Sequence, residues 1–200
     1  FLCTPEISLR RQAIVNQHCA TLPSWSANQF RAPTFAGEID GVNVRTTPPS
    51  GFIVVDGSAQ AVISPEDCGL GGKSIKILGG GSGNYFALDS VEKILVRPGE
   101  MVLATLFAKY DSSISADSIN MISQIIFYSS DDVKLSATGE DLNHLGPSGM
   151  KPGIWCCHEY SMQAIAPSGA AYYKTRSGIS GLVGSDMETF ISAIYTTILK

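Results

Sequence analysis

Short apolar runs separated by turn residues dominate the chain from residue 33 onward. Residues 73–78 alternate polar and apolar side chains, which is the pattern of a strand with one buried face. Residues 101–110 and 119–128 form the two longest apolar runs, and their β-branched and aromatic side chains favour central strands. The alanine-containing middle of the first of these runs leaves a helix open as the alternative there.

Further strands are predicted wherever similar runs stand between turn signals. They cover residues 51–57, 59–64, 85–88, 91–96, 133–136, 154–165, 170–179 and 189–199. The Asp56–Gly57 pair between the first two runs favours a hairpin, and Pro98–Gly99 forms a tight turn before residues 101–110. Roughly ten to twelve short strands, with no strong helical pattern between them, predict an all-β fold, an antiparallel β-sandwich.

The first 32 residues differ from the rest of the chain. Residues 8–22 lack Gly and Pro, are rich in Arg and Gln, and carry apolar residues with weak helical spacing. We interpret them as a short helix or an extended arm that ends at Leu22–Pro23, with a disordered leader as the alternative. Trp25 and Phe30 then stand among small polar residues, as the anchoring aromatics of an arm would. The chain is therefore divided into an N-terminal arm or docking segment, residues 1–32, and one domain, residues 33–200.

Five segments of the domain have a characteristic order and spacing. They are residues 72–77, 96–104, 126–131, 153–155 and 166–170. Together they resemble the galactose-binding-like jelly-roll carbohydrate-binding modules attached to cellulases and xylanases, a type of domain that also occurs in bacteriophage tail and fibre proteins. The resemblance implies a jelly-roll β-sandwich over residues 33–200 and a domain that binds sugars without cleaving them.

A sugar has flat C–H faces and a polar rim, so its binding site needs aromatic rings for stacking and polar side chains for the hydroxyls. These residue types stand at strand ends and within the resembling segments. The candidate ligand-binding residues are Tyr85, Tyr110, Asp111, Tyr128, Trp155, His158, Tyr160, Tyr172 and Tyr173. Tyr172 and Tyr173 are adjacent, so one of them faces outward, and the pattern does not say which. Trp155 has a second interpretation, because a Trp at this place in the resembling family is often a core residue.

The sequence carries no catalytic signature. There is no Gly-x-Ser-x-Gly motif, and the three histidines lie outside any recognisable motif. Residues 90–93 match Ser-x-x-Lys, but they fall on a predicted strand rather than at a helix start. The pairs Asp131–Asp132 and Glu140–Asp141 are interpreted as solvated loop charge rather than as the two carboxylates of a glycosidase. We predict no catalytic residue and no enzymatic activity.

Members of the resembling family commonly hold a structural calcium ion between an acidic residue near the first strand and an Asp near the last. Glu38 or Asp40 matches the first of these positions. Residues 193–197 offer no Asp for the second. We therefore assign no metal site and expect no cofactor.

Charge and composition narrow the possible partners. The net charge is −4, the sequence pI is about 5.3, and no basic cluster exceeds Arg10–Arg11, which argues against nucleic acid. No apolar segment approaches the about 20 residues that a membrane-spanning helix needs, so no membrane insertion is expected. The five cysteines are odd in number and irregularly spaced, so we predict reduced thiols in a protein that folds in a cytoplasm.

Together these features favour a non-catalytic binding or assembly module, a bacteriophage virion component such as a fibre, tail or decoration protein, assembled in the host cytoplasm. Its arm would contact other virion subunits or further copies of the chain, and its sandwich would contact cell-surface glycans. Two alternatives stay open: an accessory module of a secreted glycoside hydrolase, located outside the cell, and a purely structural subunit with no sugar site. Because the chain starts at Phe1, we expect a processed product or part of a longer polypeptide.

Overall fold

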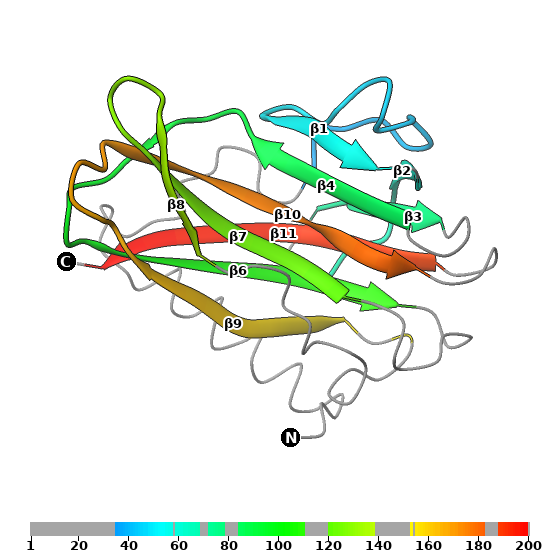
Figure 1. Cartoon of the computed structure of the whole chain (residues 1–200). Coiled ribbons are helices and arrows are strands. Elements are labelled where there is room, and N and C mark those ends of the chain that lie inside the picture. The colour runs from blue at the N-terminus through cyan, green and yellow to red at the C-terminus, as the bar shows by residue number, and fades with distance from the viewer. Residues whose placement is uncertain are drawn as a thin grey trace.

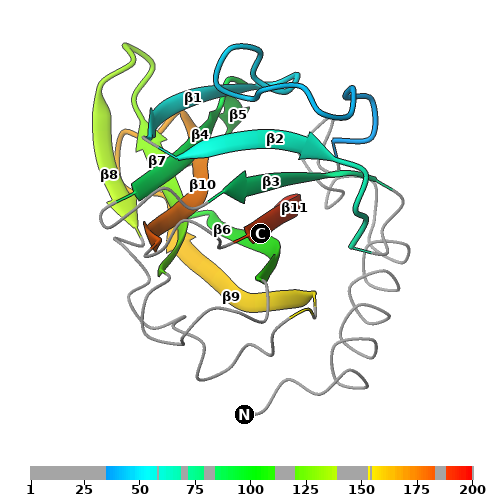
Figure 2. The same ribbon diagram turned by 90° about the vertical axis from the view of Figure 1, so that its right-hand side faces the viewer.

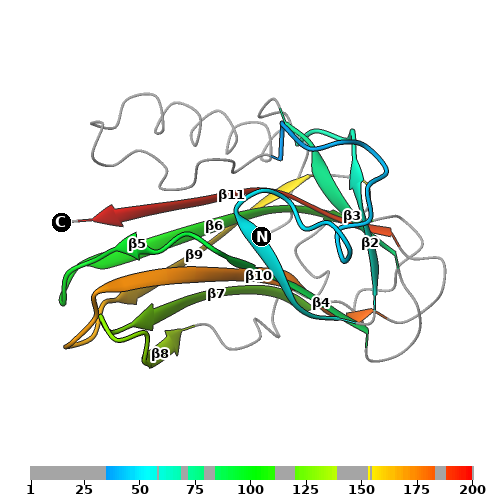
Figure 3. The same ribbon diagram turned by 90° about the horizontal axis from the view of Figure 1, so that it is seen from above.

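Two antiparallel β-sheets packed face to face make up the described part of the protein (Figure 1). The structure is a computed structural model, and it describes residues 35–57, 59–68, 72–78, 84–110, 120–138, 153, 155–182 and 188–199. Figure 3 shows the two layers, with β10 and β7 in one and β11 and β6 in the other. The predicted all-β, antiparallel sandwich is confirmed.

The strands divide between a sheet that we call sheet 1 and a sheet that we call sheet 2. Sheet 1 has the order β1 (Phe52–Gly57), β4 (Asn84–Ser90), β10 (Tyr172–Leu182), β7 (Asn120–Tyr128) and β8 (Lys134–Thr138), and β5 (Ile94–Leu95) also pairs with β10. Sheet 2 has the order β2 (Gln60–Ser64), β3 (Ser74–Leu78), β11 (Glu188–Leu199), β6 (Met101–Tyr110) and β9 (Cys156–Ile165).

The two longest apolar runs are β6 and β7, and each has a neighbouring strand on both sides. The prediction that they are central strands is therefore confirmed, and the helical alternative for residues 101–110 is wrong. Val102, Ala104 and Ala108 of β6 point into the core at every second position, as the residues of one strand face do. The alanines are therefore compatible with a strand.

The predicted hairpin between residues 51–57 and 59–64 is wrong. β1 pairs with β4 in sheet 1, whereas β2 pairs with β3 in sheet 2 (Figure 2). Phe52 and Ile63 enter the same core from opposite layers, so the chain changes sheets between them instead of folding back. The free edge of β2 is covered by residues 41–44, where the Gly41 N–H donates to the Ile63 carbonyl at 2.8 Å.

The core lies between the two sheets and is built by alternate residues of both. Its largest members include Phe86, Leu88, Ile125 and Phe127 of sheet 1 and Ile75, Ile77 and Ile191 of sheet 2. Each fully buried side chain of this size stabilises the fold by about 1.5–3 kcal/mol. The Tyr173 hydroxyl joins the layers by donating to Thr196 Oγ1 at 3.0 Å. Because one face of sheet 1 is used in this core, the residues between the core positions point away from it.

The predicted N-terminal arm, residues 1–32, lies outside the described residues, as do residues 139–152. The prediction of an arm is therefore untested. No helix in the described part of the chain is long and apolar enough to cross a membrane.

Candidate functional site

The face of sheet 1 that points away from the core carries a mixed polar and aromatic surface. Core residues of β4, β7 and β10 alternate with the residues of this surface, and cross-strand register places them side by side. We call this the outer face of sheet 1; it comprises Tyr85, Ala87 and Asp89 of β4, Tyr172, Lys174 and Arg176 of β10, and Gln124, Ile126 and Tyr128 of β7.

An ion pair between Asp89 and Arg176 stands at the centre of this face. The two residues are register partners, and the guanidinium donates from Nε to Oδ1 at 2.7 Å and from Nη2 to Oδ2 at 3.0 Å. The exposed fraction is 12% for the Asp89 side chain and 26% for the Arg176 side chain. Two parallel charge-assisted bonds fix both groups in one orientation. The pair thus presents a fixed donor and a fixed acceptor to solvent.

Electrostatics link this pair to the tyrosines on either side. Hydrogen bonding to Asp89 is the main cause that raises the pKa of Arg176, and Tyr85 adds to the rise. Burial raises the pKa of Tyr128, and the negative charge of Asp89 adds to it while Arg176 opposes it. Both tyrosine side chains are half-buried. The outer face therefore holds an ion pair between two partly exposed phenol groups.

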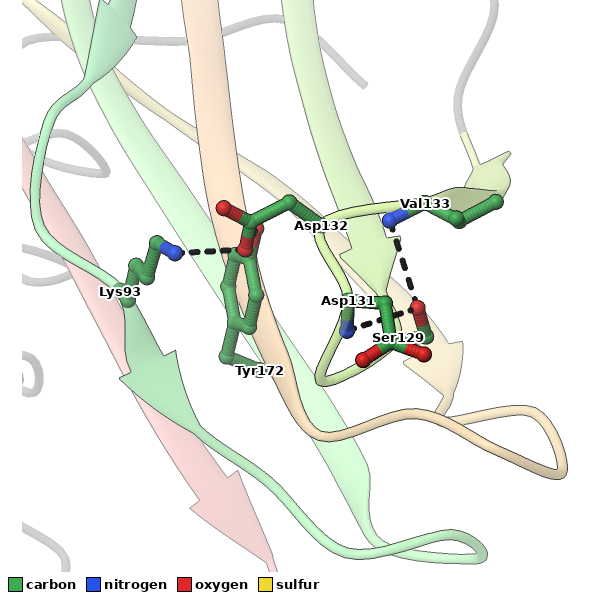
Figure 4. Close-up of polar contacts among 6 residues, drawn as sticks. All are labelled: Lys93, Ser129, Asp131, Asp132, Val133 and Tyr172. Carbon is green, nitrogen blue, oxygen red and sulfur yellow. Dashed lines mark hydrogen bonds and ion pairs between the residues drawn. The ribbon is translucent and has the colours of Figure 1, made fainter.

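A second cluster occupies the end of this face near β5. Tyr172 stacks on Tyr128, with ring centroids 5.1 Å apart and planes inclined by 6°. Lys93 Nζ lies 4.8 Å from the centroid of the Tyr172 ring and 2.5 Å from Oδ1 of Asp132, which also accepts a 2.8 Å hydrogen bond from the Tyr172 hydroxyl (Figure 4). Lys174 Nζ lies 6.0 Å from the centroid of the Tyr128 ring. Cations therefore lie over both rings of the stacked pair.

The turn between β7 and β8 directs Asp132 toward this cluster. Ser129 Oγ accepts the N–H groups of Asp131 and Val133, each at 3.3 Å, and the Asp132 N–H donates to the Ser129 carbonyl at 3.2 Å. Asp132 has a φ of 62°, in the left-handed region that Asp tolerates better than most residues. The Ser129 side chain thus closes the turn, and Asp132 points back across the sheet (Figure 4).

Asp132 is an ionised carboxylate in this arrangement. Its hydrogen bond with Lys93 is the largest cause that lowers its pKa, followed by the one with Tyr172. The same bond to Asp132 is the largest cause that raises the pKa of Lys93. Both groups are exposed, so solvent screens the pair and its contribution to stability is small. The sequence indicated only a solvated loop charge at Asp132, but the structure shows that its carboxylate binds Lys93 and Tyr172.

The structure does not bring the predicted site residues together at one site. Tyr85, Tyr128 and Tyr172 share the outer face of sheet 1. Tyr172 is the outward-facing member of the adjacent pair, yet only 5% of it is exposed, since Tyr128 and Lys93 lie against its ring. Tyr173 points into the core with 0% exposure, so a ligand on the surface cannot contact it. We therefore remove Tyr173 from the candidate site and treat Tyr172 as a support for its neighbours.

Trp155 lies on the other side of the sandwich. It is half-buried and meets the Phe190 ring of sheet 2 edge-on, with centroids 6.3 Å apart. Lys109 Nζ lies 4.3 Å from the Phe190 centroid and 5.5 Å from the Trp155 centroid, and it forms an ion pair with Glu66. Trp155 is thus neither part of the core cluster nor near the outer face of sheet 1.

Four other predicted site residues stay untested. Tyr110 lies in β6, and His158 and Tyr160 lie in β9, but their side chains are outside the described part of the structure, as is all of Asp111.

Sequence reasoning missed Asp89, Lys93, Lys174 and Arg176. Asp89 and Arg176 are 87 positions apart, and Lys93 and Asp132 are 39 positions apart, so no local motif joins them. The available signal was the alternation of Lys174 and Arg176 with the apolar and small residues of the same strand, which marks an outward face but not its partners.

The residues present do not fit the calcium site of the resembling family. The Lys73 ammonium lies 2.7 Å from Asp40 Oδ1 and donates to the Glu38 carbonyl at 2.5 Å, while the Glu38 carboxylate accepts the Ser50 N–H at 2.7 Å. A calcium ion on these oxygens would be repelled by the ammonium. Among the described residues, no three His, Cys, Asp or Glu side chains gather where they could hold a metal ion.

Comparisons with known proteins show which solved structures have a similar fold. No model of a known protein family matches the chain, and no curated protein matches its sequence. Among solved structures, the enzymatically active domain of tailspike protein 4 of bacteriophage CBA120 has a TM-score of 0.58 at 12% identity over 86% of this chain. An arabinose-bound GH51 α-L-arabinofuranosidase has a TM-score of 0.57 at 10% identity over 87%. A carbohydrate-binding module of the β-sandwich superfamily has a TM-score of 0.51 at 14% identity over 82%.

The chain spans 21%, 26% and 63% of the lengths of these three structures, respectively. At these identities they share a fold with it. The sheet order and these likenesses together show a jelly-roll β-sandwich fold, similar to that of a carbohydrate-binding module, and the predicted resemblance is confirmed at the level of the fold.

Proposed function

We propose that this chain is a non-catalytic glycan-binding module and that the outer face of sheet 1 is its binding surface. The observation that carries this proposal is the Asp89–Arg176 pair, held between Tyr85 and Tyr128 on the outer face of sheet 1. Sugar hydroxyls are both donors and acceptors, and the pair offers one fixed group of each kind. Because both side chains are already ordered, binding costs little conformational entropy.

The tyrosines complement the pair. Tyr85 and Tyr128 are half-buried, so part of each side chain reaches solvent. A sugar C–H face can pack on such a ring while its rim reaches the polar centre. Tyr172 stacks on one side of the Tyr128 ring, and Lys93 lies over the Tyr172 ring, which keeps this platform in place.

The charges of this face support binding rather than hydrolysis. A glycosidase acid needs a carboxyl whose pKa is raised, whereas the pKa of Asp132 is lowered by its partners. Both carboxylate oxygens of Asp89 already accept a hydrogen bond from Arg176, so this group is held in place for binding.

Binding to immobilised polysaccharides, measured by affinity electrophoresis, tests the proposal. Tyr128→Ala is expected to weaken binding about tenfold, as loss of an aromatic anchor does. Lys76→Gln is the matched control, since Lys76 pairs with Glu188 on sheet 2, away from this face. If no polysaccharide of a broad neutral and acidic panel is bound, or if Tyr128→Ala binds as tightly as the unmodified chain, the proposal is wrong.

The biological setting that we propose is a bacteriophage virion, with the domain as part of a fibre, tail or decoration protein assembled in the host cytoplasm. The likeness to a phage tailspike domain supports this setting. Residues 1–32 would then join the module to other virion subunits or to further copies of the chain. Removing them is expected to leave a folded sandwich that no longer assembles, as measured by light scattering and circular dichroism. Loss of the β-sheet signal would contradict this division of the chain.

The second candidate is an accessory module of a secreted glycoside hydrolase, located outside the cell. It is favoured by the likeness to the arabinofuranosidase. The encoding locus separates the two: a hydrolase domain in the same reading frame supports this candidate, and flanking genes for virion structural proteins support the first.

A further inference from the structure

Lys174 on the outer face of sheet 1 and Lys134 on the neighbouring strand β8 have no carboxylate partner among the described residues. The described part of the chain contains six lysines, of which Lys73, Lys76, Lys93 and Lys109 form ion pairs. Lys134 and Lys174 form none with a described residue. Both of them flank Tyr128: Lys134 is its register partner on β8, and Lys174 Nζ lies 6.0 Å from its ring centroid. The two lysines without an ion pair in the described part of the chain therefore both lie at the proposed platform.

The other charges of this face are already compensated. Arg176 is neutralised by Asp89 and Lys93 by Asp132, in each case through direct hydrogen bonds. Asp131 in the neighbouring turn is exposed and forms no ion pair with a described residue, and Figure 4 shows its carboxylate on the side of the turn away from Lys93. Lys93, Lys134 and Lys174 outnumber Asp131 and Asp132 by one charge, so the region beside Tyr128 is weakly positive on a chain whose net charge is −4.

Several side-chain contacts hold the aromatic groups of the positive region in place. The stacked tyrosines and the Lys93–Asp132 pair fix the Tyr128 ring, so an anionic group placed beside that ring would meet Lys134 and Lys174 while the sugar ring packs on the aromatic surface. A nucleic acid is a poor match, since two free lysines and a central Asp89 offer little to a continuous phosphate backbone.

We propose that the glycan bound by this face is anionic: a polysaccharide whose repeating unit carries a carboxylate or sulfate group, which pairs with Lys174 and Lys134 beside Tyr128. This inference rests on the proposed function and specifies its ligand class. Neutral hydroxyls of the same polymer would meet the Asp89–Arg176 pair.

Matched polymers test the charge directly. The probes are polygalacturonate, alginate and hyaluronan, each beside its carboxyl-reduced form, and dextran sulfate beside dextran, with neutral xylan and galactan added. Reduction of the carboxyl groups removes the charge while it keeps the linkage. The full chain is expected to bind at least one charged polymer about tenfold more tightly than its neutral counterpart, and to lose affinity as salt is raised from 50 to 300 mM.

Lysine variants locate the effect. Lys174→Gln and Lys134→Gln are each expected to lower affinity for the charged polymer about fivefold and to lower affinity for its neutral counterpart by a clearly smaller factor. Lys76→Gln is expected to change neither, because Lys76 lies on sheet 2 and pairs with Glu188.

The outcomes separate this inference from the function on which it rests. Equal binding of charged and neutral forms, or binding of neutral polymers alone, overturns the inference and leaves a glycan-binding module. Binding of no polymer overturns both. An equal loss of affinity for the charged polymer in Lys76→Gln also overturns the inference, because the attraction would then not depend on this site. Tighter binding of single-stranded DNA than of any polysaccharide overturns it as well, because the ligand class would then be different.

Discussion

Tyr172 and Tyr173 are neighbours in the chain and lie on opposite faces of sheet 1. Tyr173 is closed between the sheets, 6.3 Å from the Phe127 ring, and bonds Thr196 of the other layer. Tyr172 lies on the outer face, covered by Tyr128 and Lys93 and bonded to Asp132. Both are at most 5% exposed, but one is covered by the core and the other by surface side chains.

The difference shows how one strand can serve stability and binding separately. Inward residues of β10 hold the two layers together through apolar contact, so their contribution depends on volume and shape. Outward residues are held by hydrogen bonds, ring contacts and ion pairs near solvent, which contribute less to the free energy of unfolding but fix the positions of polar groups. Changes on the two faces should therefore affect different measurements.

Truncation of the inner tyrosine should have the largest effect. Tyr173→Ala leaves a cavity between the sheets and is expected to lower the free energy of unfolding by about 4 kcal/mol, whereas Tyr172→Ala loses a stacked ring at the surface and should cost about 1 kcal/mol. Urea denaturation of both variants measures the two values. Equal losses would show that the two faces do not differ in the way their environments indicate.

Gly178 tests whether the outer face tolerates change everywhere. It points outward from β10, but a Cβ built there would lie 2.0 Å from the Phe86 carbonyl oxygen of β4. Gly178→Ala must move the two backbones apart and is expected to cost about 3 kcal/mol. Thermal unfolding measures it, with Ser130→Ala in the exposed turn after β7 as a control that should change little. A Gly178→Ala protein as stable as the parent would mean that β4 and β10 are less closely packed.

Removal of Asp89 should affect stability and binding together. Asp89→Ala leaves the partly buried Arg176 guanidinium without its two bonds, at an expected cost of about 2 kcal/mol. It also removes the acceptor of the proposed binding centre, so polysaccharide affinity should fall at least about tenfold under conditions where the variant is folded. Asp131→Ala, which removes an exposed carboxylate, is the control and should leave both nearly unchanged. Unchanged binding by Asp89→Ala would remove the pair from the site.

The sequence predicted the elements well because strand signals are local. The alternation in residues 73–78 and the long runs at 101–110 and 119–128 report burial within each segment, and β3, β6 and β7 are found there. Pairing is not local. The spacing between residues 51–57 and 59–64 is the same whether they form a hairpin or enter different sheets, and the structure has the second arrangement. The site depends on that register, so Asp89 and Arg176 could not be joined in advance.

A change of pH should alter the stability contributed by the outer face and not that contributed by the inner face, and this is the smallest of the expected effects. The lowered pKa of Asp132 means that its bonds to Lys93 and Tyr172 add stability above the ordinary value of 3.8, and that this contribution is lost as the pH falls through the lowered value. The raised pKa of Lys93 sets the upper limit, because the contribution is lost as the pH rises through it from 10.5 upward. Burial raises the pKa of Tyr173, so the inner face does not titrate between these limits. The free energies of unfolding of the parent and of Asp132→Asn should therefore differ slightly near neutral pH and become equal in acid. A difference that grows as the pH falls would show that Asp132 is not stabilised in its charged form.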